Sequence, residues 1–319
     1  MINKFLDPTN DIAFKKIFGN EQNKDILIRF INDMITFKER KPIVDLTFLQ
    51  SEQNPEIATS KMSIVDVLCE DEVGNRYVVE MQVTNTRGFE KRAQYYAAKA
   101  YVNQMKKGER YEDLKEVIFL AIVDFVMFPD KEDYKSDHVI LDKKTHDNDL
   151  KDFSFTFLEL PKFKKDEKNL KNMVEKWTYF FKYTPEVEEQ KINEAFKDDV
   201  IMMKAYEELD RFSWSKEEYE LYEKVIKIKM DNAAAEEFVI MNAEKRGRAE
   251  GIKEGEARGI EKGMQKGKIE GKIEGKIEGK IEGIKEGKIE IAKKLKAMKM
   301  SGREIAKITG LSFEEIEEI

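Results

Sequence analysis

Cysteine and histidine are nearly missing from this sequence. Its 319 residues include one cysteine, Cys69, and two histidines, His138 and His146. A single cysteine excludes an internal disulfide and a cysteine-based zinc site, and it is typical of the reducing cytoplasm. Two histidines make a histidine-rich metal centre or a histidine-centred nucleophilic triad a weak hypothesis. Any metal chemistry must therefore be carried by carboxylates.

Long apolar runs are also missing. Charged residues make up 38% of the chain, and no stretch approaches the roughly 18 apolar residues that a membrane-spanning helix needs. The first residues, MINKFLDPTNDIAF, lack an uninterrupted apolar signal segment. We therefore expect a cytoplasmic protein without a membrane partner.

The part of the chain where a fold is expected has a net negative charge. The formal net charge is −7, yet residues 245–290 carry +3 and residues 291–319 carry +1, which leaves −11 for residues 1–244. An acidic domain is a poor general binder of polyanions. A nucleic-acid interpretation therefore needs a local basic groove or bound cations.

The first half of the chain has the pattern of an α/β fold. Residues 11–37 have helical spacing interrupted around Gly19 and Asn20, and Asp7 or Thr9 could begin the first helix. A second helix is expected at about residues 88–107. Strand-like runs lie at residues 43–49, 62–69, 77–83, 117–126, 138–141 and 153–160. The helix between strands predicts a crossover connection.

The second half is helical in pattern. Residues 166–244 predict a helical bundle or cap, with these packing residues: Trp177, Phe180, Phe181, Tyr206, Phe212, Trp214, Tyr222 and Val225. Glycine then recurs at every fourth position from Gly247 to Gly287, eleven times in one register. In a helix this stripe drifts by about 40° at each step, and each glycine costs roughly 1 kcal/mol against alanine. Residues 245–290 therefore form either an oligomerising helical stalk, wound right-handedly around copies of itself, or a flexible spacer.

The last segment, residues 291–319, resembles a helix-turn-helix. Ala306 would let two helices approach, and Gly310 would make the turn. The second helix, SFEEIEEI, carries four glutamates, and acidic side chains repel phosphates. A small interaction or oligomerisation pair and direct DNA reading both stay open.

Three polar residues stand in an otherwise apolar pair of strands, IVDVLCEDEVGNRYVVEMQV. Asp66, Glu80 and Gln82 carry the chemistry that this block offers, and Glu80 and Gln82 share a sheet face because they are two apart. Hard oxygen ligands suit Mg²⁺, so Asp66, Glu80 and the backbone carbonyl of Met81 predict a metal site. This chemistry favours phosphodiester cleavage.

The loop between these strands tests that prediction. Asp66 shares a face with Glu80 only if the hairpin register has an even pairing sum, which requires a three- or five-residue loop or a bulge. A two-residue turn at Gly74 and Asn75 would instead pair Asp66 with Val83 and turn it away.

Four passages in order resemble the recombination-promoting nuclease and transposase family of the PD-(D/E)XK superfamily. They are DIAFKKIFGN, the Asp66–Gln82 block, KRAQYYAAKAYVNQMKKGERYEDLKEVIFLAI, and the glycine arm ending in ITGLSFEEI. The resemblance implies a restriction-endonuclease-like mixed sheet flanked by helices, and an Mg²⁺-dependent DNA endonuclease linked to recombination, with Mn²⁺ as a substitute. It makes Asp66 and Glu80 metal ligands, and Gln82 takes the third motif position, where the superfamily has lysine.

The same resemblance adds four accessory residues. Asp11 and Lys15 share a helix face, which would bring Asp11 beside the metal and Lys15 near phosphate; a surface ion pair or cap is the alternative. Arg92 could clamp a phosphate and Tyr96 could stack or donate a hydrogen bond, or both could pack on the sheet. Lys99 is a weaker candidate.

These observations predict four regions: a nuclease core at residues 1–165, the helical bundle at 166–244, the glycine arm at 245–290 and the terminal pair at 291–319. The favoured function is metal-dependent DNA cleavage by a homo-oligomer joined through the arm. The alternative is an inactive nuclease fold that binds DNA or assembles through the arm, which the net acidity and the missing lysine favour.

Overall fold

A computed structural model of the chain describes residues 3–36, 41–50, 52–53, 63–105 and 108–319. Contacts divide it into two compact units, one ending at Asn232 and the other comprising Ala233–Ile319. Each unit is described by itself. Phe37, Met62 and Lys107, which end three predicted elements, lie outside the described residues.

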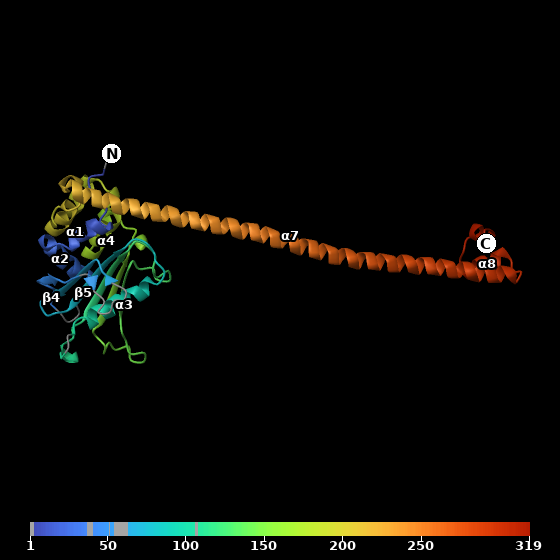
Figure 1. Ribbon diagram of the computed structural model, residues 1–319, viewed down its shortest axis with the longest axis horizontal. Coiled ribbons are helices and arrows are strands. Elements are labelled where there is room, and N and C mark those ends of the chain that lie inside the picture. Colours follow the sequence, from blue (N-terminus) through green and yellow to red (C-terminus); the bar gives the residue numbers. More distant parts are fainter. Residues whose placement is uncertain (1–2, 37–40, 51, 54–62, 106–107) are drawn as a thin grey trace. The chain divides into compact units, whose positions relative to one another are not determined.

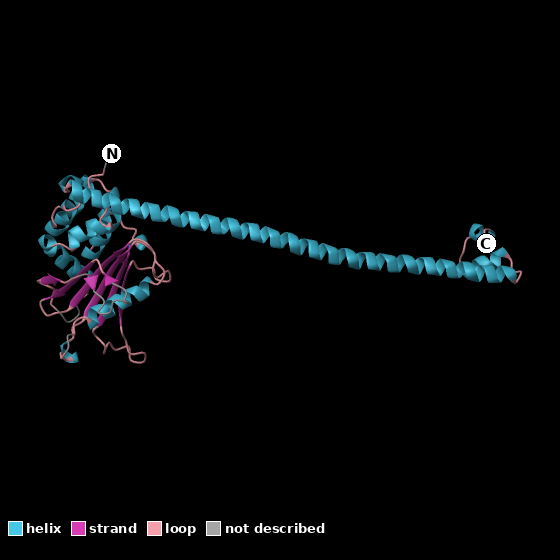
Figure 2. Ribbon diagram, viewed as in Figure 1, coloured by secondary structure: helices cyan, strands magenta, loops and turns pink. Residues whose placement is uncertain are grey.

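The first unit is built on a mixed sheet (Figures 1 and 2). Within its described residues, six strands form the order β1-β4-β5-β6-β8-β7. They are β1 (Leu46–Phe48), β4 (Val67–Asp71), β5 (Arg76–Gln82), β6 (Val117–Val123), β7 (Lys135–Val139) and β8 (Phe153–Glu159). β5, β6 and β8 run parallel, and the other neighbours are antiparallel. The predicted α/β class is confirmed.

Helix α3 (Phe89–Val102) joins the parallel strands β5 and β6, so the predicted crossover is also confirmed. All seven residues of β6 are buried, as expected for a strand inside a sheet that is covered on both faces. A separate two-stranded sheet pairs β2 (Glu52–Gln53) with β3 (Ser63–Ile64).

Different helices cover the two faces of the main sheet (Figure 1). Side chains alternate along β5, so Val78 packs with α3, whereas Val79 and Met81 join the opposite core. That larger core contains α1 (Asp11–Phe18), α2 (Lys24–Met34) and α4 (Met173–Tyr183). Alternation therefore directs Glu80 and Gln82 to the α3 face.

The later helices of the first unit extend the larger core. They are α5 (Glu189–Phe196), α6 (Val200–Glu207) and the beginning of α7 (Lys216–Ala297). Trp177 packs against Phe18 and Phe30, and Tyr222 packs against Trp214. The predicted packing residues are buried or half-buried apart from Phe212, which is 79% exposed, so that prediction is wrong.

Two local predictions fail for identifiable reasons. Asn10, rather than Asp7 or Thr9, caps α1 by accepting a hydrogen bond from the Ile12 N–H at 2.9 Å. Asp7 is not free for that role, because its carboxylate accepts from the Thr9 N–H and hydroxyl. The predicted strand at 62–69 is broken by a bend at Asp66 into β3 and β4, so Asp66 precedes a strand rather than lying in one.

The second unit consists of the rest of α7 followed by a small helical pair. The glycine array is helical throughout. Helices α8 (Gly302–Thr309) and α9 (Phe313–Glu317) pack on the end of α7 around Ile305, Leu311 and Ile316. Gly310 caps α8 with φ of +68°, which agrees with its predicted role in the turn. No helix among the described residues combines the length and the apolar composition needed to cross a membrane.

Candidate metal and nucleic-acid site

The β4–β5 hairpin decides whether the predicted carboxylates meet. Val67 lies opposite Val79 in this hairpin. The sum of the two residue numbers is even, so the next position in the register has Asp66 across from Glu80. The Asp71 N–H donates to the Asn75 carbonyl at 3.0 Å and closes a three-residue loop. Gly74 in that loop has φ of +90°, a conformation that glycine adopts without strain. The predicted odd-numbered loop is confirmed.

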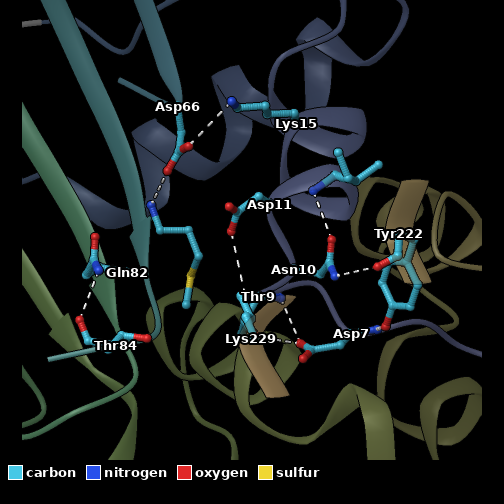
Figure 3. Close-up of polar contacts among 12 residues, drawn as sticks. Asp7, Thr9, Asn10, Asp11, Lys15, Asp66, Gln82, Thr84, Tyr222 and Lys229 are labelled. Carbon is cyan, nitrogen blue, oxygen red and sulfur yellow. Dashed lines mark hydrogen bonds and ion pairs between the residues drawn. The ribbon is translucent and has the colours of Figure 1, made fainter. Parts of the chain in front are cut away.

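The side chain of Asp66 accepts a backbone hydrogen bond from the opposite strand of the hairpin. β4 begins one residue later, and the Met81 N–H donates to Asp66 Oδ2 at 2.9 Å. The N–H and C=O of one strand residue face the same neighbouring strand in an antiparallel pair. The Met81 carbonyl therefore faces the side on which Asp66 lies. Lys15 Nζ is 3.8 Å from Asp66 Oδ1, as Figure 3 shows.

These residues border an open cleft of about 310 Å³. Its lining consists of Asp11, Asp66, Glu80, Met81, Gln82, Val83, Thr84, Arg92, Tyr96 and Lys229. Apart from the weaker candidate Lys99, the structure thus brings together every predicted site residue except Lys15, which reaches the cleft through its ion pair with Asp66. Lys99 does not line the cleft.

Glu80 is the most unusual group in the cleft. It is 5% exposed, and its buried Oε1 atom has no hydrogen-bond partner among the residues that the structure describes. Burial and, second, the neighbouring Asp66 raise the pKa of Glu80 to about 8, against the opposing charge of Arg92. Burial also raises the pKa of Asp66, against the Met81 N–H and Lys15, which lower it. Two carboxylates held in this way favour a bound cation.

The donors fit a hard divalent cation that keeps part of its water shell. Within the described ranges, no group of three or more His, Cys, Asp or Glu residues is arranged to hold a metal ion. Asp66, Glu80 and the Met81 carbonyl are the oxygen donors that such an ion could use, and Glu80 Oε1 is an acceptor without a hydrogen-bond partner among the described residues. Mg²⁺ is commonly bound by one or two carboxylates together with several waters.

Gln82 is held by its neighbours on both sides of its amide. Arg92 Nη2 donates to Gln82 Oε1, and Gln82 Nε2 donates to the Thr84 carbonyl at 2.9 Å. Arg92 Nη1 lies 3.4 Å from Thr86 Oγ1, and its guanidinium stands 4.8 Å from the centre of the Phe89 ring. The Arg92 Nε atom is buried without a partner.

Lys229 is the cleft residue that sequence reasoning missed. It lies in α7, and its Nζ is 3.6 Å from Asp11 Oδ1 (Figure 3). The same helix is tied to the segment before α1, because the Asp7 N–H donates to the Tyr222 hydroxyl at 3.0 Å and Asn10 Nδ2 to the Tyr222 carbonyl at 3.4 Å. No local pattern could indicate a partnership between residues 11 and 229.

Comparison with known proteins bears on this cleft. No curated protein and no solved structure matches the chain. A family description, PD-(D/E)XK nuclease family transposase, matches residues 8–237. This range begins just before α1, ends just past the first unit and includes all the residues that line the cleft. Since the match covers well over half of the sequence, the chain belongs to the PD-(D/E)XK nuclease family transposases, and its fold is the restriction-endonuclease-like α/β fold.

Proposed function

We propose that the protein is an Mg²⁺-dependent DNA endonuclease that takes part in recombination or the movement of mobile elements. Family membership supports nuclease-type chemistry. The observation that carries the finer proposal is the pair of largely buried carboxylates, Asp66 and Glu80, at an open cleft, with one Glu80 oxygen unpartnered. A buried carboxylate without partners is costly, and a cation relieves that cost.

Asp66, Glu80 and the Met81 carbonyl would hold the ion, and Mn²⁺ would substitute for Mg²⁺. When bound there, a divalent ion supplies charge neutralisation at a phosphate and lowers the pKa of a water molecule. Asp66 Oδ2 accepts a hydrogen bond from the Met81 N–H, which fixes the carboxylate, so Oδ1, 3.8 Å from Lys15 Nζ, would be the oxygen that faces the ion.

Local cations answer the objection that the chain is acidic. Lys15, Arg92 and Lys229 come from three different helices and are at or beside the cleft. In our proposal they contact DNA phosphates, while Tyr96 stacks or donates a hydrogen bond and Asp11 orients Lys229. A few phosphate contacts give DNA binding that is sensitive to salt. The acidic remainder of the unit repels DNA and so limits the affinity without abolishing binding.

The test is cleavage of supercoiled plasmid by purified protein with added Mg²⁺ or Mn²⁺. We expect nicking that requires the metal and that disappears in Asp66→Ala and in Glu80→Ala. Glu72→Ala is the matched control, because Glu72 is an exposed carboxylate in the hairpin loop. Nicking that persists in both cleft variants would reject this site, and metal-bound protein that never cleaves would favour an inactive binding or assembly module.

We also propose that the protein forms a homo-oligomer in the cytoplasm through the glycine array. Ile269, Ile273, Ile277 and Ile281 are each more than half exposed along the array. Apart from the neighbouring backbone of the helix itself, a Cβ added at any of its eleven glycines would meet no atom of the described residues within 4 Å, so space for a close partner is available. The free, buried Cys69 is compatible with a reducing compartment.

Light scattering on the full chain tests this assembly. Glutamine at Ile273 and Ile277 should lower the measured mass, whereas alanine at the exposed Lys272 and Lys276 should not. An unchanged mass in the isoleucine variant would reject the array as the interface.

A further inference from the structure

The cleft lacks the positive charge that a lysine at position 82 would bring. Gln82 cannot replace that charge, and both polar ends of its amide are already engaged within the chain. Its oxygen accepts from Arg92 and its nitrogen donates to the Thr84 carbonyl. The amide therefore acts as a link between the end of β5 and a guanidinium on α3.

Arg92 is held at the cleft but is not saturated. Its guanidinium is oriented by Gln82 and lies over the Phe89 ring. Its Nε is a buried donor without a partner, just as Glu80 Oε1 is a buried acceptor without one. One residue of the cleft has an unpartnered donor and another has an unpartnered acceptor. Such atoms indicate a site that a bound cation and an anionic group beside it would complete.

The charge of Arg92 reaches the carboxylates. Burial raises the pKa of both Asp66 and Glu80, and Arg92 is among the groups that lower both values. Arg92 also lies 6.0 Å from the centre of the Tyr96 ring, which lines the same cleft. The guanidinium is therefore close enough to act on the same ligand as the carboxylates.

The other two cations have different partners. Lys15 Nζ is paired with Asp66 and Lys229 Nζ with Asp11. Neither has a hydrogen bond to Gln82 like the one from Arg92. Arg92 is therefore the cation whose position depends on the residue that replaced lysine.

We propose that Arg92 is a catalytic residue that binds the non-bridging oxygens of the phosphate to be cleaved, and that Gln82 is the positioning residue that aims it. This inference rests on the proposed function. A guanidinium stays protonated, so Arg92 neither gives nor takes a proton. It stabilises charge on the phosphate by donating hydrogen bonds in a fork geometry that a lysine cannot reproduce.

Two measurements on the full-length protein test the pair. The first is the slope of log affinity against log salt for a DNA duplex in Ca²⁺, measured by fluorescence anisotropy. Loss of one phosphate contact reduces this slope by about 0.9. We expect that reduction in Arg92→Ala and not in Lys91→Ala, an exposed neighbour on α3.

The second measurement is a double-mutant cycle on the cleavage rate in Mg²⁺. We expect Arg92→Ala to lower the rate about 100-fold, a typical loss for one electrostatic donor, and Gln82→Ala about tenfold. The double alanine variant should be no slower than Arg92→Ala, because Gln82 acts through Arg92. Gln82→Lys combined with Arg92→Ala should recover at least about tenfold over Arg92→Ala, since lysine brings its own charge.

The outcomes separate this inference from the proposed function. Independent, multiplying losses at Gln82 and Arg92, or an unchanged salt slope in Arg92→Ala beside an active wild type, would overturn the inference alone. A wild type that never cleaves, while its salt slope still depends on Arg92 and Gln82, would reject the endonuclease and retain the phosphate contact. Recovery in Gln82→Lys combined with Arg92→Ala would also show that the loss of Arg92 does not unfold the protein.

Discussion

Glu80 and Glu159 are both buried glutamates near the carboxyl ends of β5 and β8, the two parallel strands that flank β6, yet their surroundings differ. Glu80 on β5 is 5% exposed and Glu159 on β8 is 1% exposed. Glu159 accepts hydrogen bonds from the Met127 N–H at 2.7 Å, the Phe128 N–H at 3.1 Å and Lys162 Nζ at 2.8 Å. Glu80 has one oxygen without any partner.

The difference separates a carboxylate that belongs to the fold from one that awaits a ligand. At Glu159 the chain itself supplies a cation and two amides, so the cost of burial is met within the protein. At Glu80 the burial is as deep and the compensation incomplete. Burial alone is therefore a poor sign of function, whereas burial with a missing partner is a useful one.

Removing the carboxylate of Glu159 should have the largest effect. Glu159→Ala leaves two backbone amides without an acceptor and removes the counter-ion of the largely buried Lys162, which keeps the Phe128 carbonyl, so we expect a loss of about 3–5 kcal/mol in the free energy of unfolding. Urea denaturation measures this loss, with the exposed Glu132→Ala as control. A change below about 1 kcal/mol would break the contrast between the two glutamates.

Glu80→Gln should have the opposite sign. The pKa of Glu80 is raised from 4.5 to about 8 by burial and by Asp66. Below pH 4.5 both folded and unfolded states are protonated, and as the pH rises to 8 only the unfolded state releases the proton freely, so the folded state loses stability. We expect the metal-free glutamine variant to exceed the wild type by about 2–4 kcal/mol at pH 8.5 and by little at pH 5. Thermal melts at the two pH values decide this; a gap that does not grow with pH would contradict it.

Added Mg²⁺ should distinguish the two sites next. At ten times the dissociation constant, a bound ion stabilises the folded state by about 1.4 kcal/mol. We expect this gain in the wild type and in Glu159→Gln, and its loss in Glu80→Gln. Equal gains in all three proteins would show that the ion binds elsewhere.

The lysines beside the two sites should give the smallest effect. Lys162 is 10% exposed and bound to Glu159, whereas Lys229 is 35% exposed and 3.6 Å from Asp11. A loose, exposed ion pair contributes little to stability, which leaves Lys229 available to a phosphate. Lys229→Ala should weaken DNA binding about threefold at low salt with unchanged stability; the exposed Lys227→Ala should match the wild type in anisotropy titrations.

Much of the fold follows from local sequence signals. The helical spacing before and after Gly19 predicts α1 and α2, and the strand–helix–strand order predicts the crossover through α3. Whether Asp66 and Glu80 share a sheet face depends on the number of residues in one hairpin loop. The observed three-residue loop agrees with the predicted odd number. These features depend on periods and turns that a short window contains.

What the sequence could not supply depends on tertiary contacts. Asp7, Thr9 and Asn10 are all acceptable caps, and Asn10 takes the role because Asp7 is bonded to Thr9. The hydrogen bond between Gln82 and Arg92 depends on where α3 lies relative to the end of β5, which no short stretch of sequence determines. Lys229 reaches Asp11 only because α7 packs on the first helices. The four-region division, the roles of the site residues and the oligomer stay predictions.

The two parts of α7, the beginning near Tyr222 and the glycine array, should differ in the rate of amide hydrogen exchange. Near Tyr222, which is 5% exposed, the helix is anchored in the core of the first unit. Along the array each glycine weakens the helix by roughly 1 kcal/mol against alanine, and no side chain among the described residues would contact a Cβ there. In the monomeric chain, we expect amides of the array to exchange at close to open-chain rates and those near Tyr222 to exchange only on global unfolding. A single helix would then contain both the slowest and the fastest helical amides of the protein.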